Sequence, residues 1–310
     1  MSRHTLYKVG QYLVNHLSLA QSYAFAKLIN YVQYMFCVKD RNSVRRNLSV
    51  ILNSPNVPNK LVREVFYNFG RYLVEFFRME KFMDDAFIAE NIHIKGEEHL
   101  DAVLKQGHGG ILISAHLGNW EMGAAVVSMR GFPITVVALT HACEQVNALF
   151  NHQRQVKGVE VVQTAKAVRT GYEAFENNRL FAIVADREFG KKGVEVEFLG
   201  KRCLMPKGAA MFSIKAGAPL IPIFLVREPD NKFQLKISDP IYPPSNVNEN
   251  NMEDEVKKLI RQYLVVIENM IHQYPEQWLV FPKFWIDSPE GTAAEPSKQH
   301  EKNCVGDQVA

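Results

Sequence analysis

The segment SAHLGNWEMG, residues 114–123, carries a histidine and a glutamate five positions apart. Imidazole has an ordinary pKa close to neutrality, so His116 could take a proton from a hydroxyl group. A carboxylate on the second ring nitrogen would fix the tautomer and stabilise the imidazolium ion, and Glu121 is the candidate for that role. Such a dyad suits acyl transfer to an alcohol, in which the nucleophile belongs to the substrate.

A turn must bring these two side chains together. The apolar run at 111–115 predicts a strand that ends just before His116, and a helix is expected to begin close to Glu121. On one straight helix the two residues would point about 140° apart. Gly118 gives the backbone the freedom to turn, and the helix dipole would favour an ionised Glu121. Asn119 lies in this turn and is counted among the candidate substrate-binding residues.

The H-x-x-x-x-E spacing alone is a weak signal, because it arises by chance in many proteins. The sequence lacks both a GxSxG nucleophile elbow and an HExxH zinc helix. Direct attack by a substrate hydroxyl is therefore the simpler mechanism. No cluster of metal-ligand residues is apparent, and no metal or cofactor is predicted.

Basic side chains near the ends of predicted strands are candidates for binding phosphate. A solvated charged surface explains most of them equally well. Arg187 directly follows an apolar strand, which favours a functional role, and Arg154 lies near another strand end. Lys207, in MPKGAAMF, lies where a helix is expected to begin near the substrate.

Strand-like and helix-like segments alternate through the middle of the chain. This alternation predicts an α/β fold with a central, mainly parallel, twisted sheet flanked by helices. Ligands of such sheets bind beyond the carboxyl ends of the strands. The predicted strands are 109–115, 132–139, 180–186, 194–199, 219–226 and 233–238, and the predicted helices are 121–130, 142–156, 165–177, 205–216 and 252–273.

Residues 6–38 are predicted to form an amphipathic helix with apolar side chains at three- and four-residue spacing. Residues 1–46 carry seven basic side chains and one acidic one, which gives them a net charge of +6 in a chain of net +3. Interruption by polar residues favours a helix that lies in a membrane interface over one that spans a bilayer. Packing on its own domain is the alternative, and periodicity alone makes it at least as probable.

The chain is expected to comprise three parts. Residues 1–38 form the membrane-associating segment, and 39–286 form one domain with a helical lead-in at 39–95 and an α/β core at 96–286. Residues 287–310 have little apolar content and are expected to be disordered. Overall, 47% of the 310 residues are apolar and 22% are charged, as in ordinary globular proteins. Four widely spaced cysteines without a CxxC pair favour a reducing, cytosolic setting.

From about Asp40 to Trp285 the chain resembles the bacterial lipid A late acyltransferases, within the glycerolipid acyltransferase superfamily marked by H-x-x-x-x-[DE]. The resemblance rests on several motifs in order, which together are far more specific than the dyad. They are DRNSVRRNL, SAHLGNWE, HACEQVNALFNHQRQVKGVEVV, the stretch from AIVADREFGKK to PLIPIFLVR, and YPEQWLVFPKFW.

The resemblance implies acyl transfer from acyl carrier protein, or from acyl-CoA, to a hydroxyl of a lipid A precursor or related glycolipid. It also implies a location at the cytoplasmic face of a bacterial inner membrane. Close relatives commonly carry D-x-D where this chain has Asp186-Arg187-Glu188, which leaves the acceptor open. The implied roles are His116 as general base with Glu121 as its partner, Arg154 and Arg187 as cationic site residues, and Asn147 and Asp186 as further site residues.

Two alternatives remain. Another glycolipid or aminolipid, such as a phosphatidylinositol mannoside, could be the acceptor. A non-catalytic lipid-binding protein of the same fold is the second alternative, and it predicts that His116→Ala leaves function intact. Nucleic acid is not expected as a partner, because the aromatic and glycine motifs that stack bases are missing.

Overall fold

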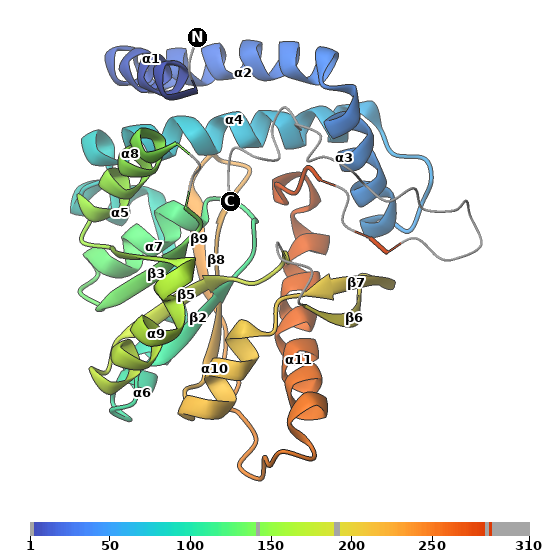
Figure 1. Ribbon diagram of the computed structural model, residues 1–310. Coiled ribbons are helices and arrows are strands. Elements are labelled where there is room, and N and C mark those ends of the chain that lie inside the picture. Colours follow the sequence, from blue (N-terminus) through green and yellow to red (C-terminus); the bar gives the residue numbers. More distant parts are fainter. Residues whose placement is uncertain (1–2, 141–142, 189–192, 283–284, 287–310) are drawn as a thin grey trace.

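A central seven-stranded sheet organises the molecule (Figure 1), and it confirms the α/β fold with a mainly parallel sheet. The computed structural model describes residues 3–140, 143–188, 193–282 and 285–286. The tail at 287–310, predicted to be disordered, lies outside the described residues. The strand order is β1-β9-β8-β2-β5-β3-β4, and every neighbouring pair is parallel except β8 with β9.

Five of the six predicted strands belong to this sheet, and the sixth does not. Residues 194–199 were expected to join it, but β6 (Val194–Phe198) pairs antiparallel with β7 (Lys201–Met205) in a separate ribbon. Alternating exposed and buried side chains along β6 suit a ribbon that packs on one face only. The sheet strands are β1 (Ile92–Lys95), β2 (Gly110–Ser114), β3 (Ile134–Ala138), β4 (Glu160–Gln163), β5 (Leu180–Val184), β8 (Leu220–Arg227) and β9 (Phe233–Ile237).

Helices cover both faces of the sheet and create two cores. Side chains alternate along β2, so that Leu112 faces one core while Ile111 and Ile113 face the other. The first core contains α6 (Glu97–Leu104), α7 (Trp120–Met129) and part of α8 (Glu144–Gln155). The second contains α9 (Ala167–Glu176), α10 (Gly208–Ala216) and α11 (Met252–Gln273). A short 3₁₀ helix, η1 (Thr164–Lys166), precedes α9, and another, η2 (Pro275–Gln277), follows α11.

Helix α4 (Asn59–Phe82) lies across one end of the sheet and joins the two cores (Figure 1). Phe66 and Phe69 belong to one core, and Phe76 and Phe77 belong to the other. Aromatic and aliphatic side chains at helical spacing are therefore buried along nearly its whole length. Helix α3 (Val38–Ile51) precedes α4, and α5 (Asp85–Asn91) follows it.

The N-terminal segment forms two helices, α1 (Arg3–His16) and α2 (Leu19–Phe36), where one helix over 6–38 was expected. The break occurs because Ser18 begins a new helix with a capping box. Its hydroxyl accepts from the Gln21 N–H at 3.2 Å, and the Gln21 side chain accepts from the Ser18 N–H at 2.9 Å. Periodicity continues across the break, which is why the sequence pattern did not reveal it.

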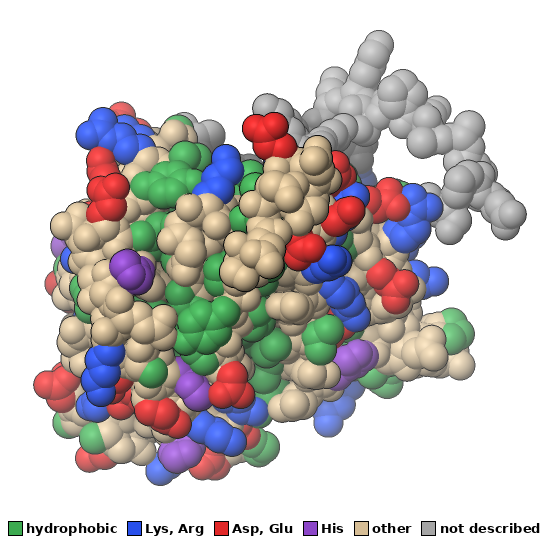
Figure 2. Space-filling model, turned by 90° about the horizontal axis from the view of Figure 1, so that it is seen from below, with side chains coloured by type: hydrophobic (Ala, Val, Ile, Leu, Met, Phe, Trp, Pro, Cys, Tyr) green, Lys and Arg blue, Asp and Glu red, His purple; other side chains and the backbone are tan. Residues whose placement is uncertain are grey.

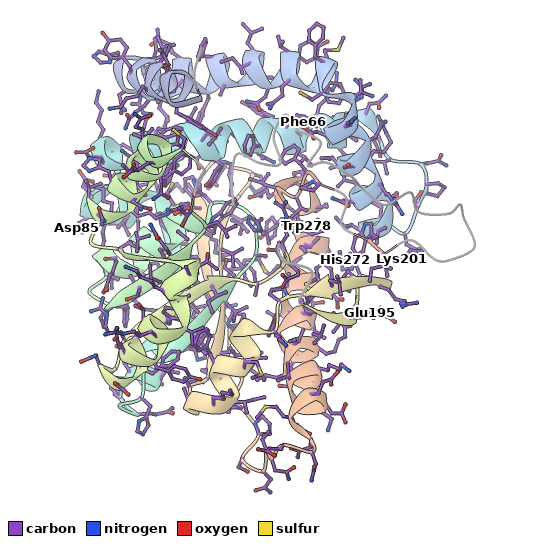
Figure 3. The ribbon with its side chains drawn as sticks, in the orientation of Figure 1. Phe66, Asp85, Glu195, Lys201, His272 and Trp278 are labelled. Atoms are coloured by element: carbon purple, nitrogen blue, oxygen red, sulfur yellow. The ribbon has the colours of Figure 1, made fainter. Side chains whose placement is uncertain are left out.

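Helix α2 buries two polar side chains on its inner side and exposes several apolar side chains on its outer side. Ser22 and Asn30 are buried against α4, whereas Leu28 and Phe36 have exposed fractions of 62% and 81%. Side chains stand out from α2 on the side away from α4 (Figure 3). Among the described residues, no helix is both long enough and apolar enough to span a bilayer.

Replacing Ser18 with alanine should lower the free energy of unfolding by about 1 kcal/mol, because the first turn of α2 loses a side-chain acceptor. Ser18→Asp should remain near the wild-type value, since a carboxylate accepts the same hydrogen bond. Urea denaturation of the two variants checks this expectation. Equal losses in both would show that the cap does not define the break between α1 and α2.

Candidate active site

The predicted strand–turn–helix is present around His116. Strand β2 ends at Ser114, and α7 begins at Trp120 with Glu121 in its first turn. Gly118 has a φ of +66°, and a Cβ atom there would lie 2.1 Å from the Leu225 carbonyl oxygen. Only glycine satisfies both the left-handed backbone and the close approach of β8.

Neighbouring segments hold the backbone of this turn on two sides. The His116 carbonyl accepts from the Leu279 N–H at 2.7 Å, and the Gly118 N–H donates to the Gln277 carbonyl at 2.9 Å. From the other side, the Asn119 N–H donates to the Leu225 carbonyl at 2.9 Å. The segment that follows α11 therefore fixes the position of His116, although it lies about 160 residues later in the chain.

Asp186, and not Glu121, occupies the second ring nitrogen of His116. The distance from His116 Nδ1 to Asp186 Oδ1 is 2.7 Å, and the His116 backbone N–H donates to Asp186 Oδ2 at 3.0 Å. Because an ionised carboxylate only accepts, Nδ1 must carry the proton, and Nε2 keeps its lone pair. The carboxylate that contacts the ring therefore differs from the predicted one and comes from the end of the neighbouring strand β5.

Asp186 is fully buried, and its ionisation depends on its hydrogen bonds. Burial by itself raises the pKa of Asp186, but the His116 imidazole and the N–H groups of His116 and Trp278 outweigh it, so the pKa lies below the ordinary value. The indole Nε1 of Trp278 donates to Oδ2 at 2.8 Å. Trp278, which lies beneath α4 (Figure 3), was not among the predicted site residues, because nothing in its local sequence indicates this contact.

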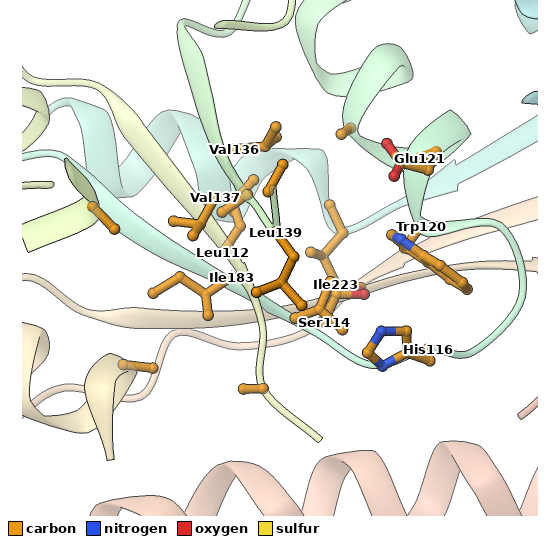
Figure 4. A pocket seen from close by; sticks show the side chains of 18 of the residues that line it. Leu112, Ser114, His116, Trp120, Glu121, Val136, Val137, Leu139, Ile183 and Ile223 are labelled. Atoms are coloured by element: carbon orange, nitrogen blue, oxygen red, sulfur yellow. The ribbon is translucent and has the colours of Figure 1, made fainter. Parts of the chain in front are cut away.

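Glu121 instead forms a buried ion pair with Arg154 of α8. Arg154 Nε donates to Oε2 at 2.8 Å, and Nη2 donates to Oε1 at 2.6 Å. Burial by itself lowers the pKa of Arg154, but the carboxylate of Glu121 outweighs it and the net shift is upward. In Figure 4 the indole of Trp120 lies between His116 and Glu121. The expected direct pairing is therefore replaced by a link that joins the start of α7 to α8.

An apolar cavity of about 560 Å³ opens beside these groups (Figure 4). His116, Glu121 and Arg154 line it at the polar end. Most of its remaining lining is aliphatic, and a cavity of this size lies in the usual range for small-molecule sites. The aliphatic lining includes Leu112, Gly123, Ala124, Val127, Val136, Ala182, Ile223 and Leu225 from α7 and four strands of the sheet.

The other candidate residues divide into two groups. Arg187 is half-buried and lines the cavity next to Asp186 in the chain. Asn119, Asn147 and Lys207 do not contribute to the described lining. Asn119 is buried behind the turn, where it caps α7 by accepting from the Met122 N–H at 3.0 Å, so its predicted substrate contact is replaced by a structural one. Lys207 is exposed, while its neighbours in sequence line the cavity.

Replacing Glu121 with glutamine should destabilise the protein by about 3 kcal/mol, because Arg154 then remains buried without a counter-charge. The matched control is Glu97→Gln, since Glu97 makes a similar two-bond pair with Arg130 at the surface. That substitution should cost less than about 1 kcal/mol. Urea unfolding compares the two, and equal costs would mean that burial adds nothing to the Glu121–Arg154 pair.

Comparison with known proteins identifies the family of this chain. Residues 16–286 match the family model described as bacterial lipid A biosynthesis acyltransferase. A phosphatidylinositol mannoside acyltransferase from Mycolicibacterium smegmatis is 28% identical over 249 residues, which cover 78% of this chain and 79% of that protein. The protein of the same name from two strains of Mycobacterium tuberculosis is 33% identical over 187 residues, covering 58% of this chain and 59% of each relative. This chain is an acyltransferase that belongs to the bacterial lipid A biosynthesis acyltransferase family.

Proposed function

We propose that the protein transfers a fatty-acyl chain from a thioester donor to a hydroxyl group of a membrane glycolipid, with His116 as the general base. The observation that carries this proposal is the 2.7 Å contact between His116 Nδ1 and the buried carboxylate of Asp186. It leaves Nε2 as a proton acceptor on a residue that lines an apolar cavity. Acyl carrier protein and coenzyme A are the two candidate donors.

The transfer needs one proton to move twice. Nε2 of His116 takes the proton of the acceptor hydroxyl while its oxygen attacks the thioester carbon. The tetrahedral intermediate then collapses, the C–S bond breaks, and the thiolate recovers the proton from the imidazolium ion. Asp186 stabilises that ion and keeps the ring oriented throughout, as in other histidine–carboxylate pairs.

The cavity offers an apolar site for the acyl chain. Its lining includes Gly123 and Val127 of α7, and Gly123 packs closely against Leu225 of β8, which is also part of the lining. Burying methylene groups there favours a long-chain donor, at roughly 0.8 kcal/mol for each CH₂ group. Arg187 lines the same cavity next to Asp186 in the chain, and its guanidinium suits a phosphate of the donor or of the acceptor.

The acceptor that we favour is a phosphatidylinositol mannoside. The relatives named above are phosphatidylinositol mannoside acyltransferases, as their names state, and one of them covers 78% of this chain. A lipid A precursor is the second candidate, and the family description favours it. Both are phosphorylated glycolipids with free hydroxyl groups, so the same base serves either one.

We place the reaction at the cytoplasmic face of the membrane, with the outer face of α2 in contact with lipid. Exposed apolar side chains are concentrated on α2 and continue to Val38. On the opposite face of the molecule, acidic, basic and apolar side chains are interspersed (Figure 2). Contiguous exposed apolar surface marks a membrane or protein interface, and a lipid acceptor favours the membrane.

His116→Ala should lower turnover by at least about 10³-fold without unfolding the protein, because general-base catalysis contributes on this order. Asp186→Asn should also lower turnover by about 10²-fold or more, since the ring loses its carboxylate partner. His152→Ala, on the exposed part of α8, is the matched control and should retain wild-type turnover. Near-normal turnover in His116→Ala would refute the mechanism.

The assay that measures these variants also identifies the substrates. Purified protein is given acyl thioesters of acyl carrier protein or of coenzyme A, each with a phosphatidylinositol mannoside or a lipid A precursor as acceptor. Mass spectrometry of the lipids reports the acylated product. Product from the lipid A precursor alone would overturn the acceptor that we favour, and product from neither would overturn the glycolipid assignment.

Replacing Leu28, Val32 and Phe36 together with serine should reduce binding to anionic lipid vesicles at least about tenfold, because the apolar area available for burial is lost. Deletion of α2 would be a poor test, since α2 covers α4. The control replaces the exposed Tyr242 and Val265 with serine, far from α2 in sequence. Vesicle sedimentation measures binding, and unchanged binding of the triple variant would contradict the membrane assignment.

A further inference from the structure

Another buried carboxylate, Glu75 of α4, lies behind the turn that carries His116 and outside the described lining of the cavity. Its exposed fraction is 2%. Oε2 accepts from the Asn119 side-chain amide at 2.8 Å, and Oε1 accepts from the Tyr23 hydroxyl at 3.0 Å. Oε1 also pairs with the guanidinium of Arg227 on β8. One carboxylate thus joins α2, α4, β8 and the turn that carries His116.

The contact with Asn119 determines how that turn is built. Since the amide NH₂ of Asn119 points to Glu75, its Oδ1 atom points the other way and accepts from the Met122 N–H. This hydrogen bond caps α7, whose first turn carries Glu121. Three residues before the cap lies His116. A change at Glu75 would therefore reach both cavity-lining groups without touching the substrate.

The contact with Tyr23 extends this arrangement to α2. Burial, together with the negative charge of Glu75, raises the pKa of Tyr23 well above its ordinary value, so its hydroxyl remains a donor. Arg227 Nη2 also reaches that hydroxyl, at 3.4 Å. The helix with the exposed apolar face is consequently bonded, through its polar underside, to the same carboxylate that orients Asn119.

Stability alone does not require an ion pair in this position. Buried ion pairs are costly to desolvate, and well-packed apolar residues are often as stabilising. What the pair supplies is a fixed direction for each of its partners, because every oxygen of Glu75 has a defined donor. A misplacement of about 1 Å at a reacting group can cost on the order of 10²-fold in rate.

We propose that Glu75 is a positioning residue for acyl transfer, and that Tyr23 makes the geometry of the His116 turn depend on how α2 is seated against α4. The proposal rests on the assignment of His116 as the general base. It predicts that contact between α2 and a lipid surface changes turnover. The effect passes from Tyr23 to Glu75, and from Glu75 to Asn119 in the His116 turn.

Glu75→Gln should lower kcat about 10- to 100-fold, while KM for donor and acceptor changes less than about threefold, because the cavity itself is intact. Tyr23→Phe, which removes one oxygen atom, should lower kcat about three- to tenfold in the same way. The double variant Glu75→Gln/Asn119→Ala should be no slower than the slower of Glu75→Gln and Asn119→Ala alone. Both substitutions act on the same hydrogen bond between the two side chains, so their effects should not add. Steady-state kinetics per folded enzyme measures all three.

Two controls separate positioning from loss of stability. Glu80→Gln is the same substitution on the same helix at an exposed carboxylate and should leave kcat unchanged. Asn178→Ala removes hydrogen bonds to the Gly109 N–H and the Leu104 carbonyl, at the opposite end of β2 from His116 and away from α2, so it should lower Tm but not kcat per folded molecule. A loss of kcat in Asn178→Ala equal to that in Glu75→Gln would overturn the proposal.

The remaining outcomes distinguish the positioning role of Glu75 from the proposed function itself. Wild-type kcat in both Glu75→Gln and Tyr23→Phe, with an inactive His116→Ala, would overturn this proposal and leave the proposed function standing. Turnover that survives in His116→Ala would overturn the function itself. If Glu75→Gln does not fold, Tyr23→Phe decides by the same kcat criterion.

Discussion

The site depends on a carboxylate that is buried without exposure to water and still ionised. Asp186 achieves this because three N–H groups donate to it, two from His116 and one from Trp278. The groups come from three segments far apart in the sequence, since β2 delivers His116, β5 delivers Asp186 and the segment after α11 delivers Trp278. An ionised acceptor on Nδ1 in turn sets the tautomer of the imidazole. The environment of His116 is therefore a product of the sheet edge and the segment after α11, and not of one motif.

The two acidic residues near His116 have different tasks because they have different partners. Asp186 accepts from the imidazole, while Glu121 is neutralised by Arg154. Removing Glu121 from this pair would leave Arg154 buried without a counter-charge, which is strongly destabilising. The second member of the H-x-x-x-x-E motif thus maintains the cavity wall between α7 and α8, and the contact with the imidazole is left to the strand-end aspartate.

Helix α4 connects this chemistry to the surface of the molecule. It contributes side chains to both cores, contacts the catalytic turn through Glu75 and supports α2 on its outer side. Tyr23 joins α2 to that contact, while the outward side of α2 carries several exposed apolar side chains. An amphipathic helix on a globular domain normally turns its apolar side chains inward. The layered order of α2, α4 and turn is what makes a link between lipid contact and turnover physically reasonable.

Local sequence determined most helices and strands and the backbone of the His116 turn. The spacing of apolar residues and the backbone freedom of glycine both act over only a few residues. The strand before His116, the left-handed Gly118 and the helix that starts at Glu121 all follow from residues 110–129. Tertiary structure decided the partners. Asp186 is 70 positions from His116 and Arg154 is 33 positions from Glu121, and no spacing rule reports which strand ends become neighbours in a sheet. The direction of the apolar face of α2 was decided in the same way, since it depends on what covers the helix and not on its period.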